Sequence, residues 1–238
     1  MNEILQVADL VFEVRRSPRR KTIGLTVDRG GQLLIHAPVD AARENLEHWT
    51  RRKLLWVHRK LALKEEMARM GREPEFVSGE SFSYLGRNYQ LKITDEQKEP
   101  LRFDGRRFYL RRDAQSAAAN FFRLWYITSG NVWIRKRVKF LALRTGMEPV
   151  RIDVRDLGFR WGSCGKNSVL FFNWKMLQLP VRLVDYVIVH ELVHLFEPLH
   201  GVTFWQAVER ALPDWKERKE ELRIKAKNML WGGGMMEQ

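Results

Sequence analysis

The sequence predicts an α+β fold in two regions, and two observations indicate this. Short β-prone runs separated by turn residues dominate residues 1–113, together with one long helical segment. Residues 114–231 instead show large apolar side chains at helical spacing, with two short alternating runs between them. Hydrophobic residues make up 45% of the 238 residues, which is ample for a buried core. Because the pattern changes after residue 113, we expect a domain boundary near that residue. We also expect a flexible tail over residues 232–238.

The β-prone runs of the first region are expected to form hairpins. TIGLTV (22–27) and QLLIHAP (32–38) flank a turn-forming RGG segment. SFSYLGRNYQLKI and LRFDGRRFYLRR follow later and predict two further hairpins. The second of these turns at Asp104-Gly105, a dipeptide typical of tight hairpin turns.

Two long helices are expected, one in each region. The first follows Asp40 as its N-cap, because apolar side chains recur at roughly helical spacing from Leu46 to Leu63. The second covers residues 114–145, where large apolar groups keep the helical period, and Gly146 then stops the helix.

The rest of the second region is expected to place two strands before three helices. VRIDVR (150–155) and SVLFFNWKML (168–177) alternate like strands. Pro180 then begins a helix through VDYVIVHELVHLFE. The segments TFWQAVERAL and PDWKERKEELRIKAKNML predict two more helices.

The segment HELVHLFEPLH holds three of the six histidines of the chain. His190 and His194 lie four residues apart, so a helix directs both rings to one face, where they can bind one metal ion. Glu191 is offset around the helix, which places its carboxylate beside the open position of the metal. Pro198 ends the helix, so His200 can return to the ion as a third ligand.

Three neutral imidazoles and one water form the tetrahedral geometry of a catalytic zinc site, so Zn²⁺ is the predicted cofactor. The prediction is a zinc-dependent hydrolase whose metal-bound water is activated by Glu191. Mn, Fe or Ni is also compatible with a three-histidine site. An alternative interpretation is a hydrogen-bonded pair of core histidines, but a charged glutamate in this apolar segment would be costly without a partner.

Four segments carry a resemblance to a known family: RWGSC at 160–164, FNWKM at 172–176, VDYVIVHELVHL at 184–195 and HGVTFW at 200–205. They resemble motifs of the YgjP-like (DUF45) metallopeptidase family, which is related to the SprT-like and minimal gluzincin zinc proteases. The resemblance is strong over residues 150–220, and SPRRKTIGLTVD and YLGRNYQL extend it to most of the chain.

The resemblance implies a zincin-like metallopeptidase domain over residues 114–231 that acts on peptides or proteins. It also implies zinc on His190, His194 and His200, with Glu191 as the general base. Two departures, Leu199 and Gly201 in place of the usual Asn and Ser, put the substrate contacts around the third histidine in question.

The RWGSC segment supplies one further candidate for catalysis, Arg160. Its guanidinium could donate hydrogen bonds to a transition-state oxygen or to a carboxylate near the metal. The alternative is that Arg160 and Trp161 only brace the helix. Cys164 is interpreted as a small buried residue, because three histidines already fill the protein's ligand positions. Phe204 and Trp205 are expected to pack over the site as core.

The net charge of +13 suggests an anionic partner. A metal-dependent hydrolase of nucleotide phosphoanhydrides is therefore a second candidate function, although the sequence contains no P-loop. A third candidate is a protease that acts on, or is recruited to, nucleic-acid-bound proteins. The basic run RRSPRRK (15–21) motivates that hypothesis, and the alternative interpretation of this run is a charged strand edge that opposes aggregation.

Cellular location is predicted from cysteine content and from apolar stretches. A single cysteine excludes an intrachain disulfide and fits a reducing compartment. The longest apolar runs fall well short of the roughly 20 residues of a membrane span, and the first residues lack the pattern of a secretory signal. These features predict a cytoplasmic protein with no membrane partner.

Overall fold

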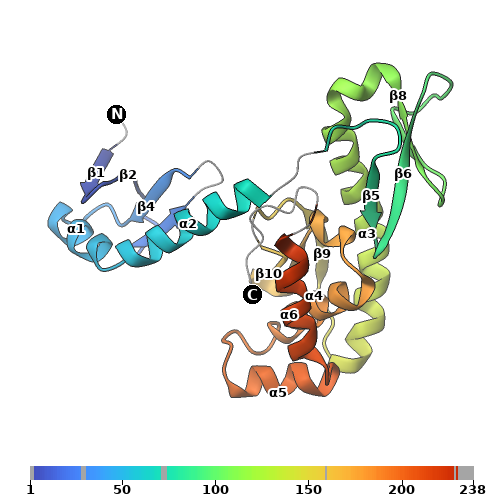
Figure 1. Cartoon of the computed structure of the whole chain (residues 1–238). Coiled ribbons are helices and arrows are strands. Elements are labelled where there is room, and N and C mark those ends of the chain that lie inside the picture. The colour runs from blue at the N-terminus through green and yellow to red at the C-terminus, as the bar shows by residue number, and fades with distance from the viewer. Residues whose placement is uncertain (1–2, 28–30, 71–73, 159, 228, 230–238) are drawn as a thin grey trace. The chain divides into compact units, whose positions relative to one another are not determined.

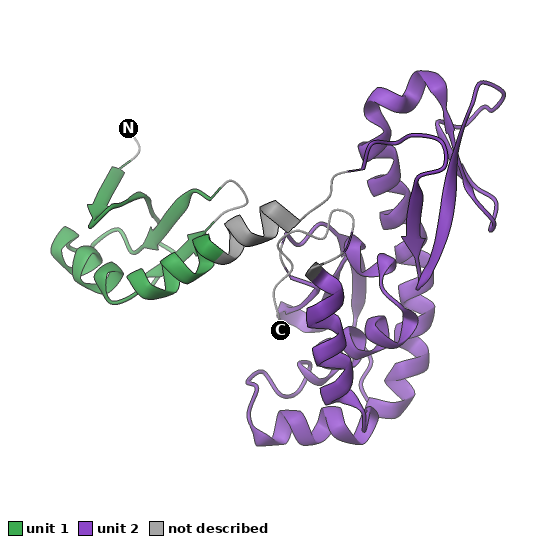
Figure 2. Cartoon of the chain, viewed as in Figure 1, with its two compact units in different colours: residues 1–69 green, residues 70–238 purple. Residues whose placement is uncertain are grey.

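The computed structural model describes residues 3–27, 31–70, 74–158, 160–227 and 229, and it confirms the α+β class. The chain divides into two compact units, residues 1–69 and residues 70–238 (Figure 2). The boundary expected near residue 113 therefore falls inside the second unit. The expected tail, residues 232–238, lies outside the described residues.

The first unit contains a four-stranded sheet in the order β1-β2-β4-β3 (Figure 1). Its strands are β1 (Glu3–Val7), β2 (Leu10–Arg16), β3 (Gly24–Val27) and β4 (Leu33–Ala37). β2 and β4 pair in parallel, and the other pairs are antiparallel. The antiparallel β3–β4 pair confirms the first expected hairpin, although Arg29 and Gly30 of its turn lie outside the described residues.

The helix expected after Asp40 is in fact two helices, α1 (Arg43–Arg51) and α2 (Leu54–Met70). Ala42 is the N-cap in place of Asp40. The helix breaks where the backbone N–H of Lys53 donates to the carbonyl oxygen of Thr50, a turn tighter than an α-helix. This turn allows Leu46 of α1 and Val57 of α2 to reach the same apolar core, and both are fully buried there.

The basic run at residues 15–21 is partly structural. The guanidinium of Arg16 donates to both carboxylate oxygens of Glu3 and to the carbonyl oxygen of Ala41, 2.7 Å away. It thereby ties β2 to β1 and to the segment before α1. Arg15 and Arg16 belong to β2, which lies between β1 and β4, whereas residues 17–21 lead to the edge strand β3, where the guanidinium of Arg20 lies against Gly24.

The second unit begins with another four-stranded sheet, in the order β5-β6-β8-β7. Its strands are β5 (Ser81–Tyr84), β6 (Arg87–Thr94), β7 (Leu101–Phe103) and β8 (Phe108–Arg111). Both expected hairpins are confirmed. At the second turn, Asp104 Oδ1 accepts the backbone N–H groups of Arg106 and Arg107, and Gly105 has a φ of +88°, which favours glycine.

Helix α3 (Ala118–Thr145) follows a 3₁₀ segment at Arg112–Ala117 and ends at Gly146, as the sequence predicts. Phe122 of α3 stacks on Phe82 of β5 with ring centroids 4.1 Å apart, and it contacts Phe108 of β8 at 5.1 Å. This aromatic core joins the β5–β8 sheet to the helix. The chain therefore does not divide at residue 113, because the strands before that point pack on the helix after it.

A third sheet has the order β10-β11-β9, with β10 at one edge. Its strands are β9 (Arg151–Arg155), β10 (Gly162–Gly165) and β11 (Val169–Asn173). β11 is shorter than the expected strand at 168–177. It ends because the side chain of Asn173 accepts the backbone N–H of Lys175 and begins a 3₁₀ segment, Trp174–Gln178.

Three helices complete the second unit: α4 (Val181–Val193), α5 (Val202–Ala211) and α6 (Trp215–Lys227). All residues from Leu183 to Val193 are buried, so α4 is the central helix of its unit and lies against β10, α3, α5 and α6. Within the described part of the chain, no helix has the length and apolar composition needed to cross a membrane.

Candidate metal centre

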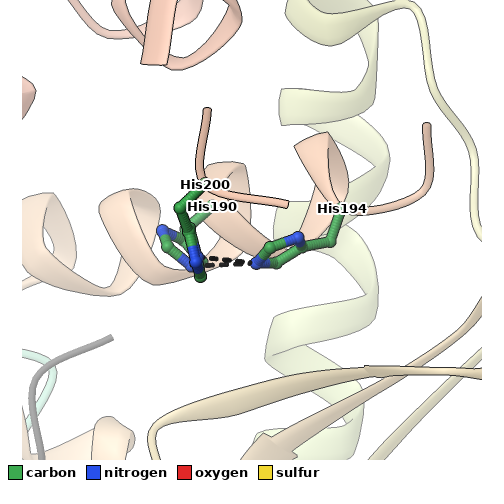
Figure 3. A group of neighbouring side chains, drawn as sticks. All are labelled: His190, His194 and His200. Atoms are coloured by element: carbon green, nitrogen blue, oxygen red, sulfur yellow. Dashed lines mark hydrogen bonds between the residues drawn. The ribbon is translucent and has the colours of Figure 1, made fainter. Parts of the chain in front are cut away.

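The three histidines of the HELVHLFEPLH segment converge (Figure 3). The Nε2 atoms of His190 and His194 lie 3.2 Å apart, and Nε2 of His200 lies 3.0 Å from each of them. A tetrahedral zinc with Zn–N bonds of about 2.0–2.1 Å places its nitrogens about 3.3–3.4 Å apart. The three nitrogens therefore fit one ion with only a small outward adjustment.

The chain leaves α4 earlier than the sequence predicted. Helix α4 ends at Val193, with His194 as its C-cap, and not at Pro198. Backbone N–H groups of Leu195 and Phe196 then donate to carbonyl oxygens three residues back, which tightens the turn. Gly201 is the N-cap of α5, so His200 lies at the end of a short loop that returns to the helix.

A backbone contact fixes the tautomer of His194. Its Nδ1–H donates to the carbonyl oxygen of Glu197 at 3.0 Å, which leaves the Nε2 lone pair free to bind a metal. His190 is only 1% exposed, and its Nδ1 has no hydrogen-bond partner among the described residues. His190 and His194 therefore both direct Nε2 toward the position where the three Nε2 atoms converge.

Burial favours the neutral form of all three rings. It lowers the pKa of His190 to about 2, with smaller contributions from His194, His200 and the cation of Lys219. Burial also lowers the pKa values of His194 and His200. A metal ion requires neutral imidazole, so these shifts favour metal binding at neutral pH.

Glu191 lies beside the histidines and against strand β10. The residue is 2% exposed, and a Cβ atom placed on Gly162 would lie 2.6 Å from its Cγ and Oε1 atoms. Real Cβ contacts are never so short, so Gly162 is required for β10 to approach the carboxylate. The sequence alone does not indicate this contact, because Glu191 is distant from Gly162 along the chain.

An open cleft of about 660 Å³ lies over this centre. It contains all five predicted site residues, the three histidines, Glu191 and Arg160. The full lining is Arg160, Gly162, Ser163, Cys164, Gly165, Lys166, His190, Glu191, His194, Pro198 and His200. Cys164 is half-buried, and burial together with the nearby charge of Glu191 raises the pKa of its thiol.

Aromatic side chains of α5 and α6 pack on the histidine rings or on one another beside the site. The ring of Phe204 is fully buried and lies 4.6–4.9 Å from the rings of all three histidines. Trp205 stacks on His200 with centroids 5.8 Å apart, and Trp215 stacks on Trp205 at 4.3 Å. The packing expected of Phe204 and Trp205 is confirmed, whereas Trp215 was missed because it lies on the next helix.

The side chain of Lys219 also contacts this group of aromatic rings. The ammonium group of Lys219 lies 4.7 Å above the ring of Trp205, on the same helix, α6, as Trp215. No motif in the sequence marked Lys219. Its spacing of four residues from Trp215 is the one local signal that it shares a helix face with that ring.

Two comparisons with known proteins found a match. A family model described as the YgjP-like metallopeptidase domain matches residues 21–225. A crystal structure of the metallopeptidase zymogen abylysin from Pyrococcus abyssi is 20% identical, with a TM-score of 0.37. That match covers 41% of this chain and 98% of the abylysin chain. The comparison with curated proteins found no match.

Proposed function

Since the chain belongs to the YgjP-like metallopeptidase family, we propose that it hydrolyses peptide bonds with one zinc ion held by His190, His194 and His200. The observation that carries this proposal is the convergence of three neutral imidazole nitrogens in an open cleft beside a buried carboxylate. The donor set of three imidazoles fits zinc. When bound, zinc would lower the pKa of a water molecule and polarise the substrate carbonyl group.

Glu191 is proposed as the general base. Its carboxylate lines the same cleft as the histidines but is not one of the three converging ligand atoms, so we assign to it the proton of the attacking water. The same group can then deliver that proton to the leaving amine. Gly162 supports this role because it lets β10 hold the carboxylate in place.

The position of β10 favours a peptide substrate over a nucleotide. β10 is an edge strand, and all four of its residues line the cleft that holds the histidines. An extended peptide can pair its backbone with such an edge, whereas a nucleotide has no matching row of donors and acceptors. This feature supports the peptidase over the phosphoanhydride hydrolase that the sequence also left open.

The substitution Glu191→Gln tests the proposed mechanism. We expect the variant to bind the metal as the wild type does and to lose about 10²–10⁴-fold in turnover, because only the proton acceptor is removed. Peptide cleavage would be followed by mass spectrometry of a mixed peptide pool, and bound metal by elemental analysis. Glu148→Gln, which changes an exposed acid outside the cleft, is the control.

Two results would contradict the proposal. Full activity of the Glu191→Gln variant would exclude this residue as the base. Phosphate release from nucleoside triphosphates, without cleavage of any peptide, would replace the peptidase with the phosphoanhydride hydrolase.

A further inference from the structure

The charge of the cleft indicates which substrates it accepts, provided that the proposed peptidase function holds. Arg160 and Lys166 both line the cleft, and both are exposed. Glu191 is the one acidic residue among the described residues of the lining. With neutral histidines, the entrance therefore carries more positive than negative charge.

Neither cation is neutralised within the described part of the protein. Other arginines of the second unit form ion pairs: Arg137 with Asp185, Arg155 with Asp153, Arg182 with Glu221, and Arg218 with Asp214. No such partner is found for the side chains of Arg160 and Lys166 among the residues that the structure describes. As far as the described residues show, the two cations at the position where a substrate must enter therefore have no acidic partner.

The backbone holds these two cations at opposite ends of β10. The carbonyl oxygen of Arg160 accepts the side-chain N–H of Asn173 at 2.9 Å, and Asn173 is fully buried. Lys166 directly follows Gly165, the last residue of the strand. A peptide paired with β10 would therefore pass one positive charge near each end of the strand.

We propose that the cleft selects peptides with aspartate or glutamate near the scissile bond, and that Arg160 and Lys166 determine this specificity. The sequence left three roles open for Arg160: binding a transition-state oxygen, binding a carboxylate near the metal, or bracing the helix. The proposal assigns it the second role, with the carboxylate supplied by the substrate. A charge-assisted hydrogen bond discriminates by about tenfold or more, and Arg160 can make two parallel ones. The net charge of +13 would also favour the approach of acidic peptides.

Matched peptides test the proposal in the full-length zinc-loaded enzyme. One cleavable sequence would be prepared with Asp or Glu, with Asn or Gln, and with Lys on either side of the scissile bond. We expect kcat/KM to be about tenfold higher for the acidic peptides than for the amide peptides, mainly through a lower KM. Lys166→Glu and Arg160→Glu should each lose this preference and shift it toward the lysine peptides.

Control variants separate charge from folding. Lys139→Glu changes an exposed cation on α3 that does not line the cleft, so it should keep the acidic preference. Lys166→Gln and Arg160→Gln provide neutral replacements in case a reversed charge impairs folding. Fluorescence anisotropy of a labelled acidic peptide on the Glu191→Gln variant measures binding without turnover, and adding Lys166→Glu should weaken that binding about tenfold.

The outcomes distinguish this inference from the proposed function. Cleavage of acidic and neutral peptides with equal kcat/KM would overturn the inference and leave the peptidase intact. So would an Arg160→Gln variant that loses kcat equally on all peptides at unchanged KM, since that pattern assigns Arg160 to the transition-state oxygen. Failure to cleave any peptide, despite bound metal, would instead overturn the proposed function.

Discussion

At the scale of single residues, the contact between Gly162 and Glu191 sets how closely β10 approaches α4. The ideal Cβ position at Gly162 lies 2.6 Å from two atoms of the carboxylate side chain. Neither element can shift without disturbing other packing, because Gly162 is buried in a paired strand and α4 is buried from Leu183 to Val193. This contact therefore couples the stability of the unit to the position of the proposed base.

Substitution of Gly162 by alanine tests this coupling. We expect the free energy of unfolding to fall by about 1–3 kcal/mol from overpacking, and turnover to fall because the carboxylate is displaced. Urea denaturation and peptide cleavage would measure the two effects. Wild-type stability together with wild-type turnover would show that the close approach is unimportant.

Trp205 is expected to position His200, the one proposed ligand that comes from a loop. Its ring stacks on both His200 and Trp215, so truncation removes the ring on which the imidazole stacks. Trp205→Ala should weaken zinc affinity by about 10–100-fold, the usual size of such supporting contacts. Trp205→Phe retains an aromatic face and should restore most of the affinity.

Competition with a chelating dye measures these zinc affinities directly. A merely structural role for Trp205 would lower the thermal stability of the metal-free protein in both variants and leave zinc affinity unchanged. That result would remove Trp205 from the support of the site.

The candidate site was largely predictable at this scale, because its ligands are local in sequence. His190, Glu191 and His194 share one turn of helix, and His200 follows after a single proline. The supporting residues were not predictable in the same way. Trp215 comes from another helix, and Gly162 comes from a strand nearly thirty residues before Glu191, so only the folded chain brings them together.

At the scale of elements, a buried ion pair fixes α4 against α3. Arg137 donates two hydrogen bonds to Asp185, both at 2.6 Å, and Asp185 is 7% exposed. No local pattern in the sequence indicates this pair, because the two residues lie 48 positions apart. The pair holds the helix that carries His190 one turn further along.

Asp185→Asn should lower the free energy of unfolding by roughly 1–3 kcal/mol, because Arg137 keeps its charge but loses its ionised partner. Glu221→Gln breaks the more exposed pair with Arg182 and should cost less than about 1 kcal/mol. Equal effects of the two substitutions in urea denaturation would contradict the role given to the buried pair.

Turns were predicted better than helix ends. The hairpin at Asp104-Gly105 and the stop at Gly146 follow from local backbone preferences, and both are confirmed. The break between α1 and α2 and the early end of α4 were missed. Both depend on tertiary packing. The first break brings Val57 into the same apolar core as Leu46, and the second lets the chain return so that His200 reaches the other two histidines.

At the scale of the whole molecule, all the proposed catalytic and binding residues belong to the second unit. The histidines, Glu191, Arg160 and Lys166 lie between residues 160 and 200, within the unit of residues 70–238. The first unit has its own sheet and apolar core. The boundary predicted near residue 113 missed this division, because no local pattern in the sequence reveals that β5–β8 pack on α3.

The central claim is that three imidazoles bind one zinc ion. X-ray absorption at the zinc edge of the purified full-length protein tests it most directly, with His200→Ala as the comparison. The account predicts one zinc per chain, bound only by nitrogen and oxygen at about 2.0–2.1 Å, with one nitrogen fewer in the variant. A Zn–S distance of about 2.3 Å, which would indicate Cys164, or a spectrum unchanged by His200→Ala, would contradict it.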